Sequence, residues 1–224
     1  MEKIKVDNLS FSYPSSDKLA LDSVSLSIPE SEFVVLCGKS GCGKSTLLRH
    51  LKKSMNPYGN KFGSVCFDGE EIEEMSDKDA ASKIGYVQQN PDNQLVTDKV
   101  WHELAFGLES LGYSNSVIKR RVAEMASYFG IQTWFRKSVS ELSGGQKQLL
   151  NLASVMAMQP EVLILDEPAS QLDPIAARDF LSTVHRLNRE LGVTIIISEH
   201  RLEEIFPLAD RAIVMDEGRI IANA

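Results

Sequence analysis

The segment formed by residues 38–45 constrains this chain more than any other. It reads Gly-Lys-Ser-Gly-Cys-Gly-Lys-Ser, which is a glycine, four further residues, and then Gly-Lys-Ser. The apolar run 33–36 before it predicts a buried strand, and residues 46–51 after it predict a helix. A strand, a glycine-rich loop and a helix in this order direct backbone N–H groups and the positive end of the helix toward a polyphosphate. The segment therefore predicts a phosphate-binding loop.

Each residue type in this loop suits a phosphate ligand. Glycine lets the backbone approach the ligand without a clash from a Cβ atom. We expect Lys44 to contact the β- and γ-phosphates as a point charge, and Ser45 to place its hydroxyl on Mg²⁺. The alternative is a glycine-rich turn that only opens a helix, and the complete motif makes this the weaker interpretation. The expected nucleotide-binding residues in the loop are Gly38, Lys39, Ser40, Gly41, Cys42, Gly43, Lys44, Ser45 and Thr46.

Two carboxylates follow a second apolar run. Residues 162–165 read Val-Leu-Ile-Leu, which predicts a buried strand, and Asp166 and Glu167 come directly after it. At the end of a strand, Asp166 is able to hold Mg²⁺ through water. Glu167 is placed to polarise an attacking water as a general base. Alone, the pair would fit a solvated acidic turn almost as well, but the phosphate-binding loop favours the catalytic interpretation.

Composition and charge limit the classes of function. At 224 residues the chain can form one large domain or one domain with a subdomain. Its formal net charge of -7 argues against a nucleic-acid-binding protein, which usually carries a basic excess. No apolar run approaches the roughly 18 residues that span a bilayer, and the first residues lack the apolar stretch of a signal peptide. The sparse cysteines, Cys37, Cys42 and Cys66, form no CxxC pair and suit a reducing cytosol.

Apolar patterning predicts a parallel α/β core, an N-terminal antiparallel sheet and an inserted helical subdomain. Alternation indicates half-buried strands at residues 4–9, 24–28 and 63–67, the last closed by an Asp68-Gly69 turn. Residues 85–87 indicate a short strand. Continuous apolar runs indicate strands of a parallel sheet covered by helices, at residues 162–165, 193–197 and 212–215.

Between residues 96 and 159 the apolar period changes to three or four, which predicts helices. The recurring residues are Val100, Leu104 and Leu108, then Ile118, Val122, Met125 and Phe129, then Leu149, Leu150, Ala153 and Met156. Another helix is expected to start at Asp173-Pro174, with Asp as N-cap and Pro at the first helical position. Its apolar face carries Ala177, Leu181, Val184, Leu187 and Leu191.

A third motif lies in the helical region, where the chain reads Leu142, Ser143, Gly144, Gly145 and Gln146. This string matches the signature of ATP-binding cassette (ABC) transporters letter for letter, and the chain resembles the nucleotide-binding domain of that family over nearly its whole length. The resemblance implies a P-loop NTPase fold, which has a RecA-like parallel sheet core with an N-terminal antiparallel β subdomain and an inserted α-helical subdomain. It implies a single ABC ATPase domain over residues 1–224, with the β subdomain and α/β core at approximately 1–88 and 160–224 and the helical subdomain at 90–158.

The resemblance also assigns roles to single residues. Tyr13 matches the aromatic residue that stacks on adenine, with a surface strand tyrosine as the alternative. Gln89 matches the glutamine that touches Mg²⁺ and the water, and Gln88 takes that role if the register slips by one. His200 matches the histidine that contacts the γ-phosphate. The implied catalytic residues are Glu167, His200, Gln89 and Lys44, and the implied metal ligands are Ser45, Gln89 and, through water, Asp166. Ser170 and Asp173 lie in the segment that crosses the dimer interface. The other histidines, which are His50, His102 and His185, are expected to be structural.

In this family the signature of one domain faces the phosphate loop of a second domain, and two ATP molecules are held between them. A turn of small residues that opens a helix can offer N–H groups and the Ser143 hydroxyl to an anion. The resemblance therefore implies ATP and Mg²⁺ as cofactors. It also implies a second ABC ATPase domain as partner, in a homodimer, a heterodimer or a tandem fusion.

Residues 90–94 read Asn-Pro-Asp-Asn-Gln and resemble the energy-coupling factor (ECF) subgroup, which includes the ATPases of cobalt, nickel and vitamin uptake systems. Residues 100–107 and 198–204 support this subgroup. The alternative is a generic importer domain whose loop is rich in Asn and Asp because of turn chemistry. In the subgroup, the region after Gln89 forms a groove for a coupling helix of a membrane-embedded subunit.

The resemblance implies a peripheral ATPase subunit on the cytoplasmic face of the cell membrane, with no nucleic-acid partner, that powers uptake of a vitamin or a transition-metal ion. A soluble ABC ATPase acting on DNA or ribosomes is a second class, but the motif spacing leaves no room for a long coiled coil, and the chain lacks a second domain and a basic linker. A non-catalytic scaffold is disfavoured by Lys44, Asp166, Glu167 and His200. Relatives often continue past the last predicted strand. Two interpretations of the chain are therefore open: one domain of a tandem protein, or an engineered fragment.

Overall fold

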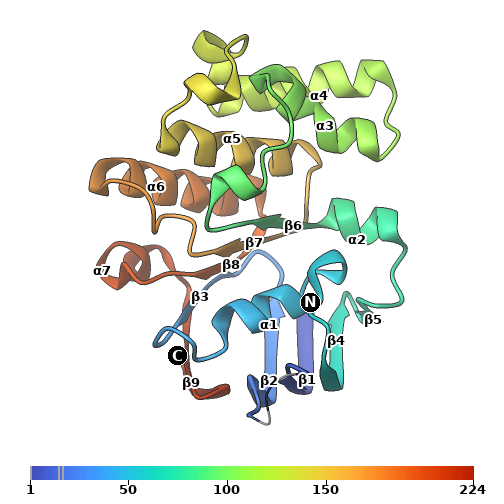
Figure 1. Cartoon of the computed structure of the whole chain (residues 1–224), viewed down its shortest axis with the longest axis vertical. Coiled ribbons are helices and arrows are strands. Elements are labelled where there is room, and N and C mark those ends of the chain that lie inside the picture. The colour runs from blue at the N-terminus through green and yellow to red at the C-terminus, as the bar shows by residue number, and fades with distance from the viewer. Residues whose placement is uncertain (1, 15, 17) are drawn as a thin grey trace.

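Two sheets organise the chain in the computed structural model, which describes residues 2–14, 16 and 18–224 (Figure 1). The N-terminal sheet is antiparallel, with the order β2-β1-β4-β5. Its strands are β1 (Glu2–Ser12), β2 (Leu21–Pro29), β4 (Asn60–Phe67) and β5 (Glu70–Glu71). The larger sheet has the order β10-β9-β3-β8-β7-β6, and its pairs are parallel except for β9 with β10. Its strands are β3 (Phe33–Cys37), β6 (Ile84–Val87), β7 (Val162–Asp166), β8 (Thr194–Ser198), β9 (Arg211–Asp216) and β10 (Arg219–Asn223).

Helices cover both faces of the larger sheet. Helix α1 (Lys44–His50) lies between the two sheets, and α5 (Gly144–Ala157) and α6 (Pro174–Leu191) cover the opposite face (Figure 1). Beyond α5, and farthest from the N-terminal sheet, lie α3 (Val100–Ser110) and α4 (Asn115–Tyr128). The shorter elements are α2 (Asp77–Lys83), α7 (Leu202–Ile205), and the 3₁₀ turns η1 (Lys53–Met55), η2 (Pro91–Asn93), η3 (Ile131–Trp134), η4 (Val139–Glu141) and η5 (Phe206–Leu208).

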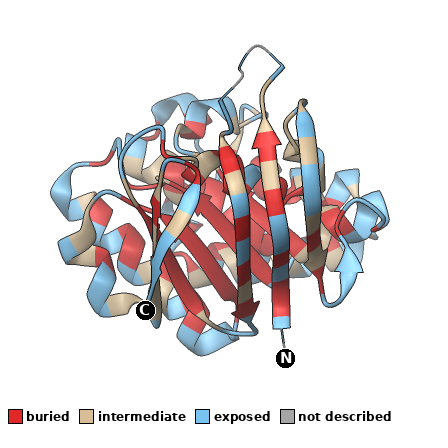
Figure 2. Ribbon diagram, turned by 90° about the horizontal axis from the view of Figure 1, so that it is seen from below, coloured by how far each residue is buried: buried red, intermediate tan, exposed pale blue. Residues whose placement is uncertain are grey.

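Alternate residues of the central strands enter two different cores. In β3, Val34 and Leu36 pack with α1 and the N-terminal sheet, whereas Phe33 and Val35 pack toward α5 and α6. Because successive side chains of a strand point to opposite faces, a strand covered on both faces must be apolar throughout. The central strands are accordingly buried along their length (Figure 2).

The structure confirms the predicted fold class, with an antiparallel sheet, a mostly parallel sheet and covering helices. The predicted turn after β4 is present, with left-handed φ values of 48° at Asp68 and 84° at Gly69. The predicted cap of α6 is also present, because the Asp173 side chain accepts hydrogen bonds from the backbone N–H groups of Ile175 and Ala176, both at 3.0 Å.

Several details differ from the prediction. Leu191 was predicted to lie on the apolar face of α6, but it ends that helix and is 50% exposed. Residues 212–215 were predicted to be buried on both faces, yet Ala212 and Val214 are only half-buried because β9 lies next to the edge strand β10. Helix α2 and strand β10 were missed, since α2 buries only Ala80 and β10 is largely exposed, so neither has the apolar periodicity that sequence patterns detect. Among the described residues, no helix is both long and apolar enough to cross a bilayer.

Candidate active site

The phosphate-loop candidate connects the end of β3 to the start of α1. A Cβ atom at Gly38 would lie 2.2 Å from the carbonyl oxygen of Met215, and one at Gly43 would lie 2.6 Å from that of Ala20. These two glycines, with φ of 143° and 109°, are therefore required by the protein's own backbone. At Gly41, with φ of 78°, nothing lies within 4 Å of such an atom. The loop therefore packs against the backbone of the protein at Gly38 and Gly43, whereas Gly41 faces open space.

Lys44 places a positive charge inside this loop. Its side chain is buried, and Nζ donates hydrogen bonds to the carbonyl oxygens of Gly38 at 2.9 Å and Lys39 at 3.2 Å. Nζ also lies 3.9 Å from Oε1 of Glu167. An ammonium group has three N–H donors. The two carbonyls use two of them, which leaves one donor for a phosphate or for the Glu167 carboxylate.

Asp166 is the centre of a network of hydroxyl groups. Its Oδ1 accepts hydrogen bonds from Ser45 Oγ at 2.9 Å and Ser198 Oγ at 2.8 Å, and its Oδ2 accepts one from the Tyr86 hydroxyl at 3.2 Å. Burial, and then the neighbouring Asp166 charge, raise the pKa of Tyr86, so this hydroxyl remains a neutral donor. Mg²⁺ prefers oxygen ligands and keeps several waters. The Ser45 hydroxyl and the Asp166 carboxylate therefore fit a magnesium ion.

Glu167 is contacted by two of the predicted catalytic residues. His200 Nε2 lies 2.8 Å from Oε1 of Glu167, and Gln89 Nε2 donates to Oε2 at 3.3 Å. The backbone of Glu167 has a φ of 47°, and its N–H is held by the carbonyl and hydroxyl oxygens of Ser198, both at 3.0 Å. A left-handed conformation costs energy in a residue other than glycine and is common at functional sites. This conformation occurs directly after β7, at the predicted general base.

A pocket of about 450 Å³ joins most of the predicted nucleotide-binding residues. The Tyr13 hydroxyl lies 3.1 Å from Thr46 Oγ1, and the Tyr13 ring packs edge-on against Phe11. Ala20, which also lines the pocket, is not predictable from the sequence, because an alanine in a loop carries no chemical signal. Gly38, Lys39 and Cys42 are not part of the lining. The lining residues are Tyr13, Ala20, Ser40, Gly41, Gly43, Lys44, Ser45, Thr46, Gln89 and Glu167.

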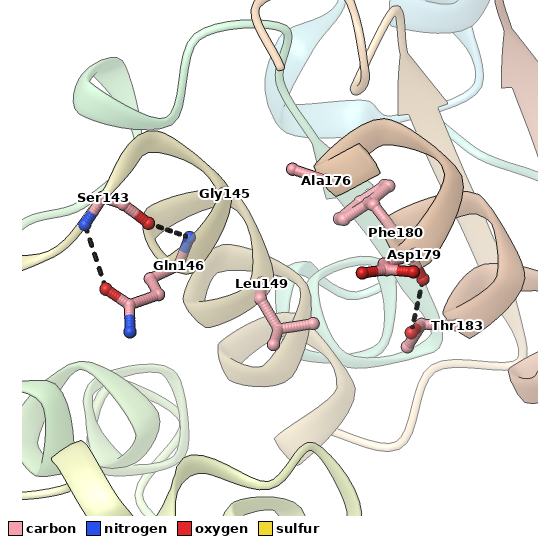
Figure 3. Close-up of a pocket in the computed structure, with 8 residues that line it drawn as sticks. All are labelled: Ser143, Gly145, Gln146, Leu149, Ala176, Asp179, Phe180 and Thr183. Carbon is pink, nitrogen blue, oxygen red and sulfur yellow. Dashed lines mark hydrogen bonds between the residues drawn. The ribbon is translucent and has the colours of Figure 1, made fainter. Parts of the chain in front are cut away.

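The signature residues form a capped helix start at a different place. Ser143 Oγ accepts from the Gln146 N–H at 3.3 Å, and Gln146 Oε1 accepts from the Ser143 N–H at 3.0 Å (Figure 3). This reciprocal capping box fixes the first turn of α5. Signature residues do not line the phosphate pocket in the described part of the chain. Instead they share a smaller, mainly apolar pocket of about 260 Å³ with α6, lined by Ser143, Gly145, Gln146, Leu149, Ala176, Asp179, Phe180 and Thr183 (Figure 3).

The segment predicted to cross a dimer interface also lies outside the phosphate pocket. Ser170 Oγ donates to the carbonyl oxygen of Glu167 at 2.8 Å, so the segment is attached to the residue that follows β7. Asp173 is used as the N-cap of α6. The site of one copy of this chain therefore contains the loop, the two carboxylates, Gln89 and His200, but neither the signature nor these two residues.

Three polar side chains of α5, two of them buried amides, hold the segment around Gln89, and the sequence does not predict these contacts. Because a polar residue on an apolar helix face has no local signal for its partner, only the three-dimensional structure reveals these contacts. They are Gln148 Nε2 to the Gln88 carbonyl at 3.1 Å, Asn151 Nδ2 to the Pro91 carbonyl at 3.4 Å, and Lys147 Nζ to Asp92 Oδ1 at 2.6 Å. Gln148 and Asn151 are fully buried.

We expect Gln148→Leu to lower the free energy of unfolding by ~1 kcal/mol. A carbonyl that loses its donor in a buried site costs ~1–3 kcal/mol, and the loss is reduced because Gln148 Oε1 has no hydrogen-bond partner among the described residues. Urea denaturation measures this change. Gln132→Leu is the matched control, since Gln132 is exposed and donates to the Ser127 carbonyl at 3.5 Å. An equal effect of both substitutions would contradict the assigned contact.

His50 is a buried histidine near the end of α1. Its Nδ1 lies 2.7 Å from the Thr46 carbonyl oxygen, and its ring packs edge-on against Phe11. A carbonyl only accepts, so Nδ1 carries the proton. Nε2 is buried without a hydrogen-bond partner in the part of the chain that the structure describes. Burial lowers the pKa of His50, which is therefore neutral in the folded protein at neutral pH.

The depressed pKa of His50 predicts a loss of stability in acid. Between the unfolded pKa of about 6.5 and the lower folded pKa, the unfolded chain binds a proton that the folded chain does not, so the free energy of unfolding falls as pH falls. His50→Asn keeps a donor for the Thr46 carbonyl but does not titrate. We expect the wild-type protein to lose more stability than this variant between about pH 7.5 and 5.5 in urea denaturation. Parallel losses would show that His50 is not the titrating group.

The profile of the ABC transporter family matches residues 21–170, a span that contains the phosphate loop, the signature and the two carboxylates. The chain belongs to the ABC transporter family. Within that family it is the ATP-binding domain.

Relatives and solved structures agree with this assignment. An ABC transporter ATP-binding protein, as its name describes it, of Bacillus thuringiensis subsp. konkukian is 52% identical over 217 residues. The alignment covers 97% of this chain but 39% of that protein, so the chain spans well under half of the relative's length. CbiO1 from Clostridium perfringens, part of the ABC transporter complex CbiONQ, superposes with a TM-score of 0.89 at 32% identity, covering 100% of this chain and 89% of CbiO1. The bacterial ABC transporter cassette MJ0796, solved as a dimer, gives 0.84 at 25% identity, covering 99% and 97%.

Proposed function

We propose that this domain hydrolyses ATP as one of two paired domains and thereby powers a membrane importer of the ECF type, on the cytoplasmic face of the cell membrane. The observation that carries the proposal is the division of the site. The phosphate loop, the Lys44 ammonium group and Glu167 surround one pocket. The signature residues line a different pocket on another surface of the same chain. A second copy or a related domain would complete each pocket with its signature.

In this proposal the phosphate loop and Lys44 bind the β- and γ-phosphates, and Tyr13 stacks on the adenine. Ser45, Gln89 and, through water, Asp166 hold Mg²⁺, which neutralises charge on the phosphate oxygens when bound. Glu167 accepts the proton of the attacking water as general base.

His200 and Gln89 position Glu167 in this reaction. Their contacts at 2.8 and 3.3 Å occupy one oxygen each of the Glu167 carboxylate. A carboxyl oxygen has two acceptor sites. Each oxygen thus keeps a lone pair that can accept from a water, and the two side-chain contacts fix the orientation of the carboxylate.

The paired arrangement is supported by the family and by a dimeric relative. The solved cassette MJ0796 is a dimer and has the same fold. Donors on both sides of the nucleotide would exclude water and stabilise charge that develops on the γ-phosphate. The partner domain is either a second copy or a related domain, and the 39% coverage of the Bacillus relative leaves room for such a domain in one polypeptide.

Coupling to a membrane subunit is supported by the segment that follows Gln89. Asn90 caps the turn η2, because its Oδ1 accepts a hydrogen bond from the Asp92 N–H at 3.0 Å. The turn is attached to α5 through the hydrogen bond from Asn151 to the Pro91 carbonyl. Beyond it, Val96 is 66% exposed, Trp101 45% and Phe106 38%. A contiguous apolar surface is typical of a binding site for another protein, and we propose that these three side chains contribute to such a surface for the membrane subunit. CbiO1 is part of an ABC transporter complex.

The ATPase rate per molecule, measured over a range of protein concentrations, tests the paired site. We expect this rate to rise with concentration and to reach a plateau. A rate that is independent of concentration in a monomeric sample would overturn the paired site. Co-purification from membranes, with Trp101→Ala as the weakened variant, tests the membrane subunit separately.

A further inference from the structure

Both neighbours of His200 in the sequence hold the same distant segment. Glu199 is buried, with 1% of its surface exposed, and its Oε1 accepts a hydrogen bond from the Ala169 N–H at 2.9 Å. Arg201 donates from Nη2 to the Leu172 carbonyl oxygen at 2.9 Å. The chain after β8 is therefore attached to residues 169–172 at two points, one on each side of His200.

Glu199 also fixes the backbone of its own loop. Its second oxygen, Oε2, accepts from the N–H groups of His200 at 3.0 Å and Arg201 at 3.5 Å. One buried carboxylate thus connects two loops, with Oε1 on one and Oε2 on the other. A charged acceptor makes stronger hydrogen bonds than a neutral one.

Residues 169–172 form a closed turn that offers its middle to the surface. Leu172 N–H donates to the Ala169 carbonyl at 3.2 Å, and both of these residues are buried. Ser170 and Gln171, between them, are exposed. The loop of His200 thus holds Ala169 and Leu172, which are the buried ends of the turn. The exposed middle of the turn, Ser170 and Gln171, is accessible to another domain.

We propose that Glu199 and Arg201 are positioning residues that clamp the turn 169–172 to the loop of His200, so that the two move as one body. This inference rests on the proposed function and on two roles that the family resemblance implies: His200 contacts the γ-phosphate, and residues 170–173 meet the second domain. A displacement of His200 by the γ-phosphate is then passed directly to Ser170 and Gln171. The clamp connects the nucleotide of one pocket to the interface with the partner domain.

The chemistry of the clamp requires a carboxylate at position 199. In Glu199→Gln one oxygen becomes an NH₂ group, which cannot accept, so one of the two loops loses its contact. In Arg201→Gln the shorter side chain does not reach the Leu172 carbonyl, whereas Arg201→Lys keeps a donor at similar length. These substitutions leave the Glu167 and His200 side chains in place.

Steady-state ATPase kinetics of the single variants test the clamp. For Arg201→Gln we expect the maximal rate to fall about tenfold and the KM for ATP to change by less than about twofold, because a contact used during turnover is lost while nucleotide contacts remain. Glu199→Gln is expected to act in the same direction, and Arg201→Lys to restore most of the rate. Arg186→Gln is the matched control, since Arg186 also donates to a backbone carbonyl, that of Tyr128 at 3.4 Å.

Hydrogen exchange provides a readout that a purely structural role would not move. In the wild-type protein, ATP is expected to slow amide exchange of residues 169–173 together with residues 198–201. In Arg201→Gln, the response of residues 169–173 should be weaker while that of residues 198–201 is retained, because the contact from Glu199 to Ala169 remains. If His200→Ala abolishes activity while both clamp variants match Arg186→Gln in rate and in exchange, the clamp is wrong and the proposed function stands. If His200→Ala is as active as the wild-type protein, the proposed function fails and the clamp falls with it.

Discussion

Glu167→Gln is expected to slow ATP hydrolysis by about 10²- to 10⁴-fold, the usual contribution of a general base. The amide has nearly the same shape as the carboxylate but does not accept a proton from water. In the structure the carboxylate has His200 at 2.8 Å on one oxygen and Gln89 at 3.3 Å on the other, so protein side chains orient both of its oxygens. The rate at saturating ATP measures the effect.

ATP binding should survive this substitution. The expected phosphate contacts come from the loop and Lys44, and Glu167 Oε1 lies 3.9 Å from Lys44 Nζ, beyond hydrogen-bond distance. Titration with a fluorescent ATP analogue measures the affinity. Glu74→Gln is the control, because Glu74 is exposed on the N-terminal side of α2 and is expected to leave the rate unchanged. If Glu167→Gln retained a tenth or more of the wild-type rate, another group would be the base.

The sequence predicts most of this fold because the local patterns of apolar and capping residues agree with the tertiary structure of the protein. The central strands are apolar on both faces, and the structure buries them between two cores. The cap of α6 needs only Asp173 and Pro174, which are adjacent in the chain. The short helix α2 was missed because its stability comes from its Ser76 cap and from neighbours, with only Ala80 buried. Helices that bury little apolar surface leave little pattern to read.

The sequence predicts which motif residues lie together at the candidate site, but it does not predict the residues that support them. Glu167, Lys44 and Ser45 lie at fixed offsets within strand and loop motifs, and the structure places them around one pocket or next to it. Glu199 and Gln148 act through partners 30 and 60 positions away. No local pattern names such a partner, because the contact depends on how two loops meet in space. The polar side chains that connect one motif to another are therefore identified only in the three-dimensional structure.

Lys44→Ala is expected to weaken ATP binding about 10- to 100-fold, which corresponds to the ~1.5–3 kcal/mol of a hydrogen bond to a charged group. The buried ammonium is held by two carbonyl oxygens, at 2.9 and 3.2 Å, in the middle of the phosphate loop. Its removal takes away the positive charge that faces the phosphates. The same analogue titration measures the loss.

Lys44→Ala and Glu167→Gln should therefore fail at different steps, one at binding and the other at hydrolysis. Lys5→Ala is the matched control, since Lys5 is exposed on β1 and is expected to leave both steps unchanged. Thermal unfolding checks that Lys44→Ala still folds, because the substitution also leaves the Gly38 and Lys39 carbonyls without their donor. A folded Lys44→Ala protein with wild-type affinity for ATP would mean that the ammonium only stabilises the loop, and the phosphate contact assigned to it would be wrong.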